Sequence, residues 1–132
     1  KFRAWDKKYK KMMKVNQIDF EKKTVWLEAD NGDHENRHTL TREFKDVILM
    51  QSTGLKDKNG VEIFEGDIVQ YRDGEYSYLG IVKRDCYQFF IDGIEPDDNY
   101  DFIDVSNTFD GTSSLEILGN IHENPELLEV AE

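Results

Sequence analysis

The chain has 132 residues, 38% of them hydrophobic and 12% aromatic, with a formal net charge of −11 at pH 7. This length predicts a single domain with its own core, and the aromatic share favours a β-rich globule. No stretch approaches the roughly 20 apolar residues of a membrane helix, the charged N-terminus is unlike a signal peptide, and the single cysteine, Cys86, cannot form an internal disulfide. We therefore expect a cytoplasmic protein that does not contact a membrane.

Charge is divided unevenly along the sequence. Residues 1–50 hold 12 Lys and Arg against 9 Asp and Glu, whereas residues 84–132 hold 1 against 13. A solvated acidic surface explains this tail, and a face that docks on a basic partner surface is the functional alternative. Phosphate repulsion disfavours direct nucleic-acid binding over most of the chain. The lysine-rich start leaves such binding open, through Lys7, Lys8, Lys10, Lys11 and Lys14.

The hydrophobic pattern has a period of two along most of the chain, which predicts strands rather than helices. Strands are expected at 2–5, 13–20, 24–29, 35–40, 47–50, 68–71, 76–82, 86–91, 102–105 and 115–118. A turn signal at 30–33 joins 24–29 and 35–40 into a hairpin, and residues 92–101 are predicted as an acidic loop. Near the end of the chain we expect a short helical turn, with Asn124 as its cap and Pro125 at its first position.

Residues 51–66 are predicted as a loop rich in turn signals. Glycines there permit positive φ at sharp turns, and aspartates accept hydrogen bonds from nearby backbone amides. The residues of this structural turn motif are Gly54, Asp57, Asn59, Gly60, Gly66 and Asp67. A phosphate-cradling loop is the functional alternative, but the glycine spacing fits neither of the common phosphate-binding motifs. We interpret the segment as turns that lead into a barrel strand.

Two neighbouring patterns indicate the architecture. Gly66-Asp-Ile-Val-Gln-Tyr71, a turn, and then Leu79-Gly-Ile-Val-Lys83 are typical of SH3-like barrels, where a glycine lets a strand bend. The predicted fold is mainly β and forms a single domain over residues 1–132. In it, an SH3-like barrel spans about 46–122, N-terminal strands at 1–45 pack on the barrel, and a tail follows at 123–132.

Three blocks of sequence carry a family resemblance. They are Phe2-Arg-Ala-Trp-Asp6, Gln51-Ser-Thr-Gly-Leu-Lys-Asp-Lys-Asn-Gly60 running into Ile63-Phe-Glu-Gly-Asp-Ile-Val69, and Leu118-Gly-Asn-Ile-His-Glu-Asn-Pro-Glu-Leu-Leu128. In this order, and spanning nearly the whole chain, they resemble the YopX family of phage and prophage proteins. The resemblance implies a phage-encoded cytoplasmic protein with an SH3-type barrel and no established biochemical function. It transfers no catalytic or ligand residue.

Residue types that carry chemistry do not form a recognisable site. His34 and His38 lie in a hairpin, where the i, i+4 spacing does not bring them together, and His122 is far away, so satisfied or exposed histidines are expected rather than a zinc site. Cys86 is interpreted as an inert thiol in a strand. The acids of residues 92–104 lack an EF-hand pattern, so weak cation association is expected rather than a dedicated calcium site. We expect no enzyme activity, cofactor or metal.

The predicted function is a non-enzymatic interaction module that docks on a basic host or phage protein through an acidic face. The expected face consists of Asp92, Glu95, Asp97, Asp98, Tyr100, Asp101 and Asp104. An exposed aromatic patch is expected beside it, and it could also join copies into a homo-oligomer. The candidates for this patch are Tyr76, Tyr78, Tyr87, Tyr100 and Phe109. Two alternatives stay open: a nucleic-acid-binding accessory protein that uses the lysine-rich N-terminus, and an enzyme with an unrecognised site.

Overall fold

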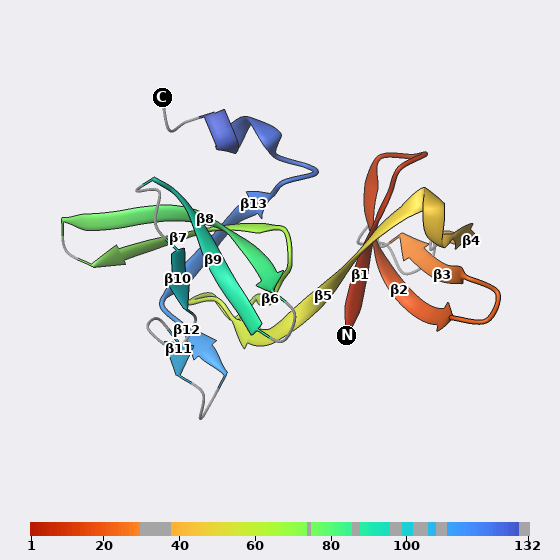
Figure 1. Ribbon diagram of the computed structural model, residues 1–132, viewed down its shortest axis with the longest axis horizontal. Coiled ribbons are helices and arrows are strands. Elements are labelled where there is room, and N and C mark those ends of the chain that lie inside the picture. The colour runs from red at the N-terminus through yellow and green to blue at the C-terminus, as the bar shows by residue number, and fades with distance from the viewer. Residues whose placement is uncertain are drawn as a thin grey trace. The chain divides into compact units, whose positions relative to one another are not determined.

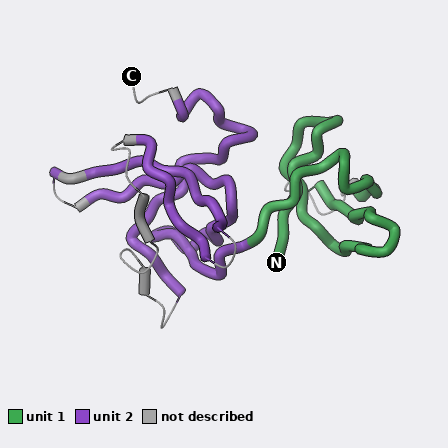
Figure 2. The backbone as a smooth tube through the Cα atoms, in the orientation of Figure 1, with its two compact units in different colours: residues 1–51 green, residues 52–132 purple. Residues whose placement is uncertain are grey.

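The structure is a computed structural model that describes residues 1–29, 38–73, 75–85, 88–95, 99–101, 106–107 and 111–129. Strands dominate it, as predicted, and short 3-10 turns are its helical elements over the described residues (Figure 1). The chain divides into two compact units, Lys1–Gln51 and Ser52–Glu132 (Figure 2). None of the described helices has the length and apolar character needed to cross a membrane.

Unit 1 is an antiparallel sheet in the order β5-β1-β2-β3-β4. Its elements are β1 (Phe2–Asp6), β2 (Lys11–Asp19), β3 (Thr24–Ala29), β4 (His38–Glu43), the 3-10 turn η1 (Phe44–Asp46) and the first half of β5 (Val47–Lys56). The predicted hairpin between the third and fourth strands is confirmed, since Leu27 pairs with Leu40. Its turn, at 30–33, lies outside the described residues.

One face of this sheet forms the core of unit 1. The buried apolar residues are Ala4, Met13, Val25, Leu27, Ala29 and Val47. Residues that pair across a ladder project to the same face. The register pairs Asp6 with Lys11 and Arg42 with Val25, so three charged residues share the core face with the apolar ones. This placement brings the ends of β1, β2 and β4 into one polar site.

Unit 2 contains an antiparallel sheet in the order β10-β9-β8-β7-β13. Its elements are β6 (Glu62–Phe64), β7 (Asp67–Asp73), β8 (Tyr76–Asp85), β9 (Gln88–Glu95), β10 (Asn99–Asp101), β11 (Ser106–Asn107), β12 (Thr112–Ser113), β13 (Leu115–Asn120) and η3 (Pro125–Glu129). The second half of β5 pairs with β6 and β12. The buried apolar core consists of Ile63, Val69, Tyr78, Val82, Ile91 and Leu115. An SH3-like barrel is compatible with this arrangement and stays a prediction, as does the packing of residues 1–45 on it.

The predicted loop at 51–66 is wrong in its first part, because β5 continues to Lys56 and pairs with β6. The Thr53 hydroxyl donates to the Ile63 carbonyl at 2.8 Å, and a register shift in the ladder surrounds Gly54, whose φ is 80°. From Gln51 to Lys56 the side chains of β5 are mostly polar, so the alternation of apolar residues that predicted other strands is missing in this part.

The predicted acidic loop at 92–101 is also partly wrong. β9 runs through Glu95, and β10 pairs with it so that Asn99 lies opposite Asp92. Buried positions alternate with less buried ones along β9, since Ile91 and Gly93 are buried while Asp92 is not. The acidic residues among these positions made the segment look like a loop, so the period of two was not recognised in the sequence. The predicted strand at 102–105 lies outside the described residues.

The chain forms the predicted short helical turn, η3, at Pro125. The Leu127 N–H donates to the Asn124 carbonyl at 3.1 Å. The Asn124 side chain, predicted as a cap, turns back toward β13, where its Oδ1 accepts the Asn120 N–H at 3.2 Å. A Cβ on Gly119 would lie 2.4 Å from that oxygen, so a larger residue at this position would displace the Asn124 side chain.

Candidate functional site

The acidic residues predicted as a docking face are only partly described. Asp97, Asp98 and Asp104 lie outside the described residues, and of Glu95, Tyr100 and Asp101 the structure gives the backbone alone, in β9 and β10. Asp92 is partly buried, and its carboxylate forms an ion pair with the Lys83 ammonium. One acid of the predicted face is therefore already neutralised within unit 2.

The predicted aromatic patch is wrong for Tyr78. This side chain is buried in the core of unit 2, where its ring lies 5.4 Å from that of Tyr71 across the β7–β8 ladder. Position 78 faces the core because β8 keeps strict alternation from Tyr78 through Val82. Tyr87 and Phe109 lie outside the described residues.

The aspartates of the turn motif act as structural anchors. Asp57 is buried, and its Oδ1 accepts the N–H groups of Asn59 and Val61, both at 2.9 Å. Its Oδ2 accepts the Ile117 N–H at 3.2 Å, which ties the turn to β13. Asp67 is buried as well and accepts the Phe64 N–H at 2.8 Å.

The structure also places two glycines of the turn motif and one of the histidines. Gly60 and Gly66 have φ of 83° and 86°, values that favour glycine. The His122 N–H donates to Asn120 Oδ1 at 3.0 Å, whereas His34 lies outside the described residues. Over the part of the chain that the structure describes, no group of three or more His, Cys, Asp or Glu residues could hold a metal ion.

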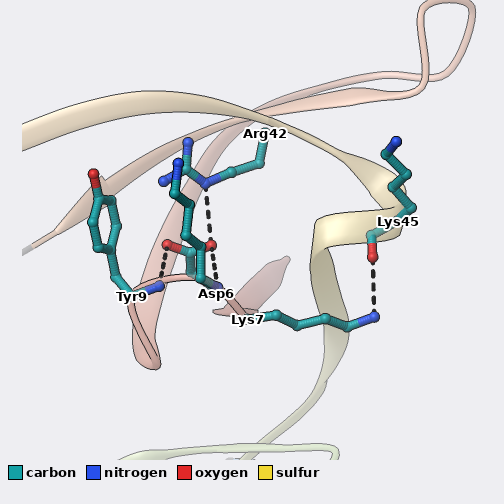
Figure 3. A network of polar contacts seen from close by, with 6 residues as sticks. Asp6, Lys7, Tyr9, Arg42 and Lys45 are labelled. Carbon is teal, nitrogen blue, oxygen red and sulfur yellow. Dashed lines mark hydrogen bonds and ion pairs between the residues drawn. The ribbon is translucent and has the colours of Figure 1, made fainter.

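A polar site that the sequence did not reveal lies at the turn between β1 and β2 (Figure 3). The Asp6 carboxylate is fully buried and accepts the N–H groups of Lys8 at 3.4 Å and Tyr9 at 3.3 Å. The Asp6 carbonyl accepts the Lys10 N–H at 2.8 Å, and Lys10 has a φ of 55°. A single buried aspartate thus fixes the backbone of the turn.

Arg42 of β4 completes this anchor from the other side. Its Nε donates to Asp6 Oδ1 at 3.2 Å, and its guanidinium carbon lies 5.0 Å from the centre of the Tyr9 ring. The hydrogen bond to Asp6 raises the pKa of Arg42 above its ordinary value, so the group stays charged. Cation–π contact orients Tyr9, whose side chain remains 60% exposed.

We call residues 7–11 the cationic turn, since four of its five residues are lysines and all five are exposed. The Lys7 ammonium donates to the Lys45 carbonyl at 3.0 Å (Figure 3). No carboxylate among the described residues forms an ion pair with Lys8, Lys10 or Lys11. Several cations of unit 2 are paired with acids instead. These pairs are Lys58–Glu116, Lys83–Asp92 and Arg84–Glu65.

A hollow of about 490 Å³ lies beside the cationic turn, on the core face of the unit 1 sheet. The described residues that line it are Tyr9, Lys11, Met13, Ala29, Thr39 and Leu40. The lining therefore brings three apolar residues together with one aromatic and one cationic residue. Its volume falls within the range of ligand pockets.

The sequence signals for this site were incomplete. The lysines of the turn were visible as charge, which left nucleic-acid binding open as an alternative. The burial of Asp6 was not visible, because its partner Arg42 lies 36 residues away in the sequence. An aspartate before a run of lysines looks like any exposed turn residue.

Comparison with known proteins gives a consistent result over nearly the whole chain. The family model described as "YopX protein" matches residues 1–129. The crystal structure of protein EF1440 from Enterococcus faecalis is similar, with a TM-score of 0.60 and 29% identity over 97% of this chain and 96% of that one. The crystal structure of protein yopX from Bacillus subtilis has a TM-score of 0.59 and 20% identity over 96% and 95%, which supports the fold alone. No curated protein matches the sequence.

Proposed function

The chain belongs to the YopX family, and we propose that it is a non-enzymatic interaction module encoded by a phage or prophage and acting in the cytoplasm of the bacterial host. The division of charge between the two units carries this proposal. Unit 1 holds 12 Lys and Arg against 9 Asp and Glu, whereas unit 2 holds 5 against 19. The phage origin rests on the family resemblance.

The acidic unit is proposed to dock on a basic protein surface of the host or phage. Unit 2 has 5 basic residues for 19 acidic ones, and Lys58, Lys83 and Arg84 already pair with carboxylates, so the net charge of this unit is strongly negative. A surface with such an excess of one charge accelerates association with an oppositely charged partner, and this effect weakens as salt rises. Such a surface also discriminates against acidic proteins.

The test uses a variant in which all acids of residues 92–104 are changed to the matching amides. Full-length wild type and variant are used to capture proteins from host lysate, and each captured protein is purified and its affinity measured again at low and high salt. A basic protein whose affinity falls with salt, and falls again by about tenfold in the variant, supports the proposal. The control Glu21→Gln/Glu43→Gln removes exposed acids from unit 1 and leaves the affinity unchanged.

The cationic turn favours a second candidate function, a nucleic-acid-binding accessory protein. Its lysines are exposed, and the backbone that displays them is fixed by Asp6. Lysines on a fixed turn neutralise phosphates and release counterions, which makes binding strongly salt-dependent. A mobility-shift assay with single-stranded and duplex DNA tests this function. A chain that shifts neither form at low salt does not bind nucleic acid.

A further inference from the structure

We propose that unit 1 binds a single strand of nucleic acid, with phosphates held by the cationic turn and one base received by the hollow beside Tyr9. This inference rests on the second proposed function and names its ligand. It is carried by four features that the structure places together: an anchored backbone, three lysines that pair with no described carboxylate, an exposed aromatic ring and a hollow of suitable size.

Asp6 and its partners hold the backbone of the cationic turn in one conformation before a ligand binds. Asp6 accepts two backbone N–H groups of the turn and the side-chain Nε–H of Arg42, and the Lys7 N–H donates to the Asp46 carbonyl at 3.1 Å. The backbone is therefore ordered before binding, which lowers the entropy lost when a ligand is bound. Because Asp6 already pairs with Arg42, its charge does not cancel those of the lysines.

Tyr9 gives the turn a surface for stacking. The Arg42 guanidinium lies over its ring, and the side chain is nevertheless 60% exposed. An exposed ring held in place by a cation accepts a base irrespective of sequence, because every base has a flat π face. A lysine cluster that binds phosphates alone does not need such a ring.

The hollow selects for an unpaired base. Met13, Ala29 and Leu40 line it with apolar side chains, and Tyr9 and Lys11 of the cationic turn line it as well. A base has a flat apolar body and a polar edge, and its full insertion requires that it is not stacked inside a duplex. The geometry therefore favours a single strand over a double helix.

The charge of unit 2 restricts the ligand further. With 5 basic against 19 acidic residues, this unit repels a polyanion. Binding should be confined to a short stretch of about 4–16 nucleotides at unit 1 and should weaken steeply with salt. An acidic peptide is the competing ligand, because its carboxylates would also pair with the lysines. Its acidic side chains would not stack on the aromatic ring or fill the apolar hollow.

The experiment measures fluorescence anisotropy of labelled oligomers of about 15 nucleotides with the full-length chain, at about 50 and about 200 mM salt. The probes are single-stranded oligothymidine, oligouridine, a duplex of the same length and an abasic strand with the same number of phosphates. Single strands are expected to bind at least about tenfold more tightly than the duplex and the abasic strand. Comparison of the thymidine and uridine probes separates DNA from RNA.

Variants assign the contacts. Lys8→Gln/Lys11→Gln is expected to weaken all probes and to lower the salt slope by about 2, whereas Lys22→Gln/Lys23→Gln removes the same charge from another turn of unit 1 with a smaller effect. Tyr9→Leu is expected to weaken the single strands about tenfold and to spare the abasic strand. Tyr9→Phe keeps the ring and restores the affinity, which separates stacking from a loss of folding.

Each opposing result has its own meaning. If no probe binds at low salt, both the nucleic-acid function and this inference fail. If the duplex and the abasic strand bind as tightly as the single strands, or if Tyr9→Leu has no effect, this inference fails. Binding of phosphates by the cationic turn would then still be supported. If an oligoglutamate of equal charge displaces the thymidine probe as well as unlabelled thymidine does, the turn belongs to an acidic protein partner.

Discussion

Arg42 donates a hydrogen bond to Asp6 at 3.2 Å across 36 residues of sequence, and this ion pair links the edge strand β4 to the turn between β1 and β2. The Asp6 carboxylate is fully buried, and the Arg42 side chain is 16% exposed. The pair therefore serves two purposes. It satisfies the backbone of the cationic turn, and it keeps a buried negative charge from weakening the field of the lysines around it.

Removal of one member of this pair is expected to destabilise unit 1. Asp6→Asn leaves the Arg42 guanidinium without its counterion and should lower the free energy of unfolding by about 3 kcal/mol. Both tryptophans of the chain, Trp5 and Trp26, lie in unit 1, so urea unfolding followed by their fluorescence reports this unit.

The matched control for this experiment is the exposed ion pair between Glu43 and Lys45, whose side chains are 61% and 77% exposed. Glu43→Gln should change the free energy of unfolding by no more than about 0.5 kcal/mol, because solvent screens such a pair. Equal effects of the two substitutions would show that the buried pair has no special role.

Gly119 is expected to tolerate no side chain. In Gly119→Ala the new Cβ would lie 2.4 Å from Asn124 Oδ1 and 2.6 Å from Asn124 Cγ, so the Asn124 side chain has to shift and give up its hydrogen bond with the Asn120 N–H, at a cost of about 2 kcal/mol. Gly60→Ala is the comparison, since its φ of 83° is strained for alanine but nothing lies within 4 Å of the new Cβ.

The strain at position 60 should cost only about 1 kcal/mol, and Gly60→Asn should recover part of it, because asparagine tolerates positive φ. Thermal unfolding by circular dichroism ranks the three variants. An unfolding temperature for Gly119→Ala equal to that of the wild type would contradict the close approach of Asn124.

Asp57 is expected to hold the turn of residues 57–61 against β13. Asp57→Ala removes the acceptor of three backbone N–H groups and should cost about 3 kcal/mol, whereas Asp57→Asn keeps one acceptor oxygen and should cost less. Amide hydrogen exchange gives the local readout: Asn59, Val61 and Ile117 should lose protection first. Unchanged exchange at Ile117 in Asp57→Ala would show that β13 is held by other contacts.

Much of the strand architecture follows from the sequence. An apolar residue at every second position identifies a strand even when its partner strand is unknown. β3 has this pattern at Val25, Leu27 and Ala29, whereas the more polar strand β4 was predicted from the turn signal at 30–33. The end of β5 lacks the pattern, and a polar strand looks like a loop until β6 is placed beside it. The acidic hairpin of β9 and β10 was missed for the same reason.

The polar anchors could not be predicted from the sequence in the same way. Asp6 and Asp57 look like ordinary turn residues, and only the fold shows that they are buried and which amides they accept. Asn124 looked like a helix cap, but its side chain serves β13. Each of the three blocks that carry the family resemblance contains one of these residues. The blocks therefore encode the buried anchors of turns as much as the strands between them.

The proposed docking of the acidic unit on a basic protein is tested most directly by titration of one purified partner. The affinity of the full-length chain for a basic protein captured from the host is measured by calorimetry at low and high salt. The measurement is repeated with the acids of residues 92–104 changed to amides. The account predicts that affinity falls with salt and is about tenfold weaker in the variant. Equal affinity of the two proteins, or affinity that does not change with salt, would contradict it.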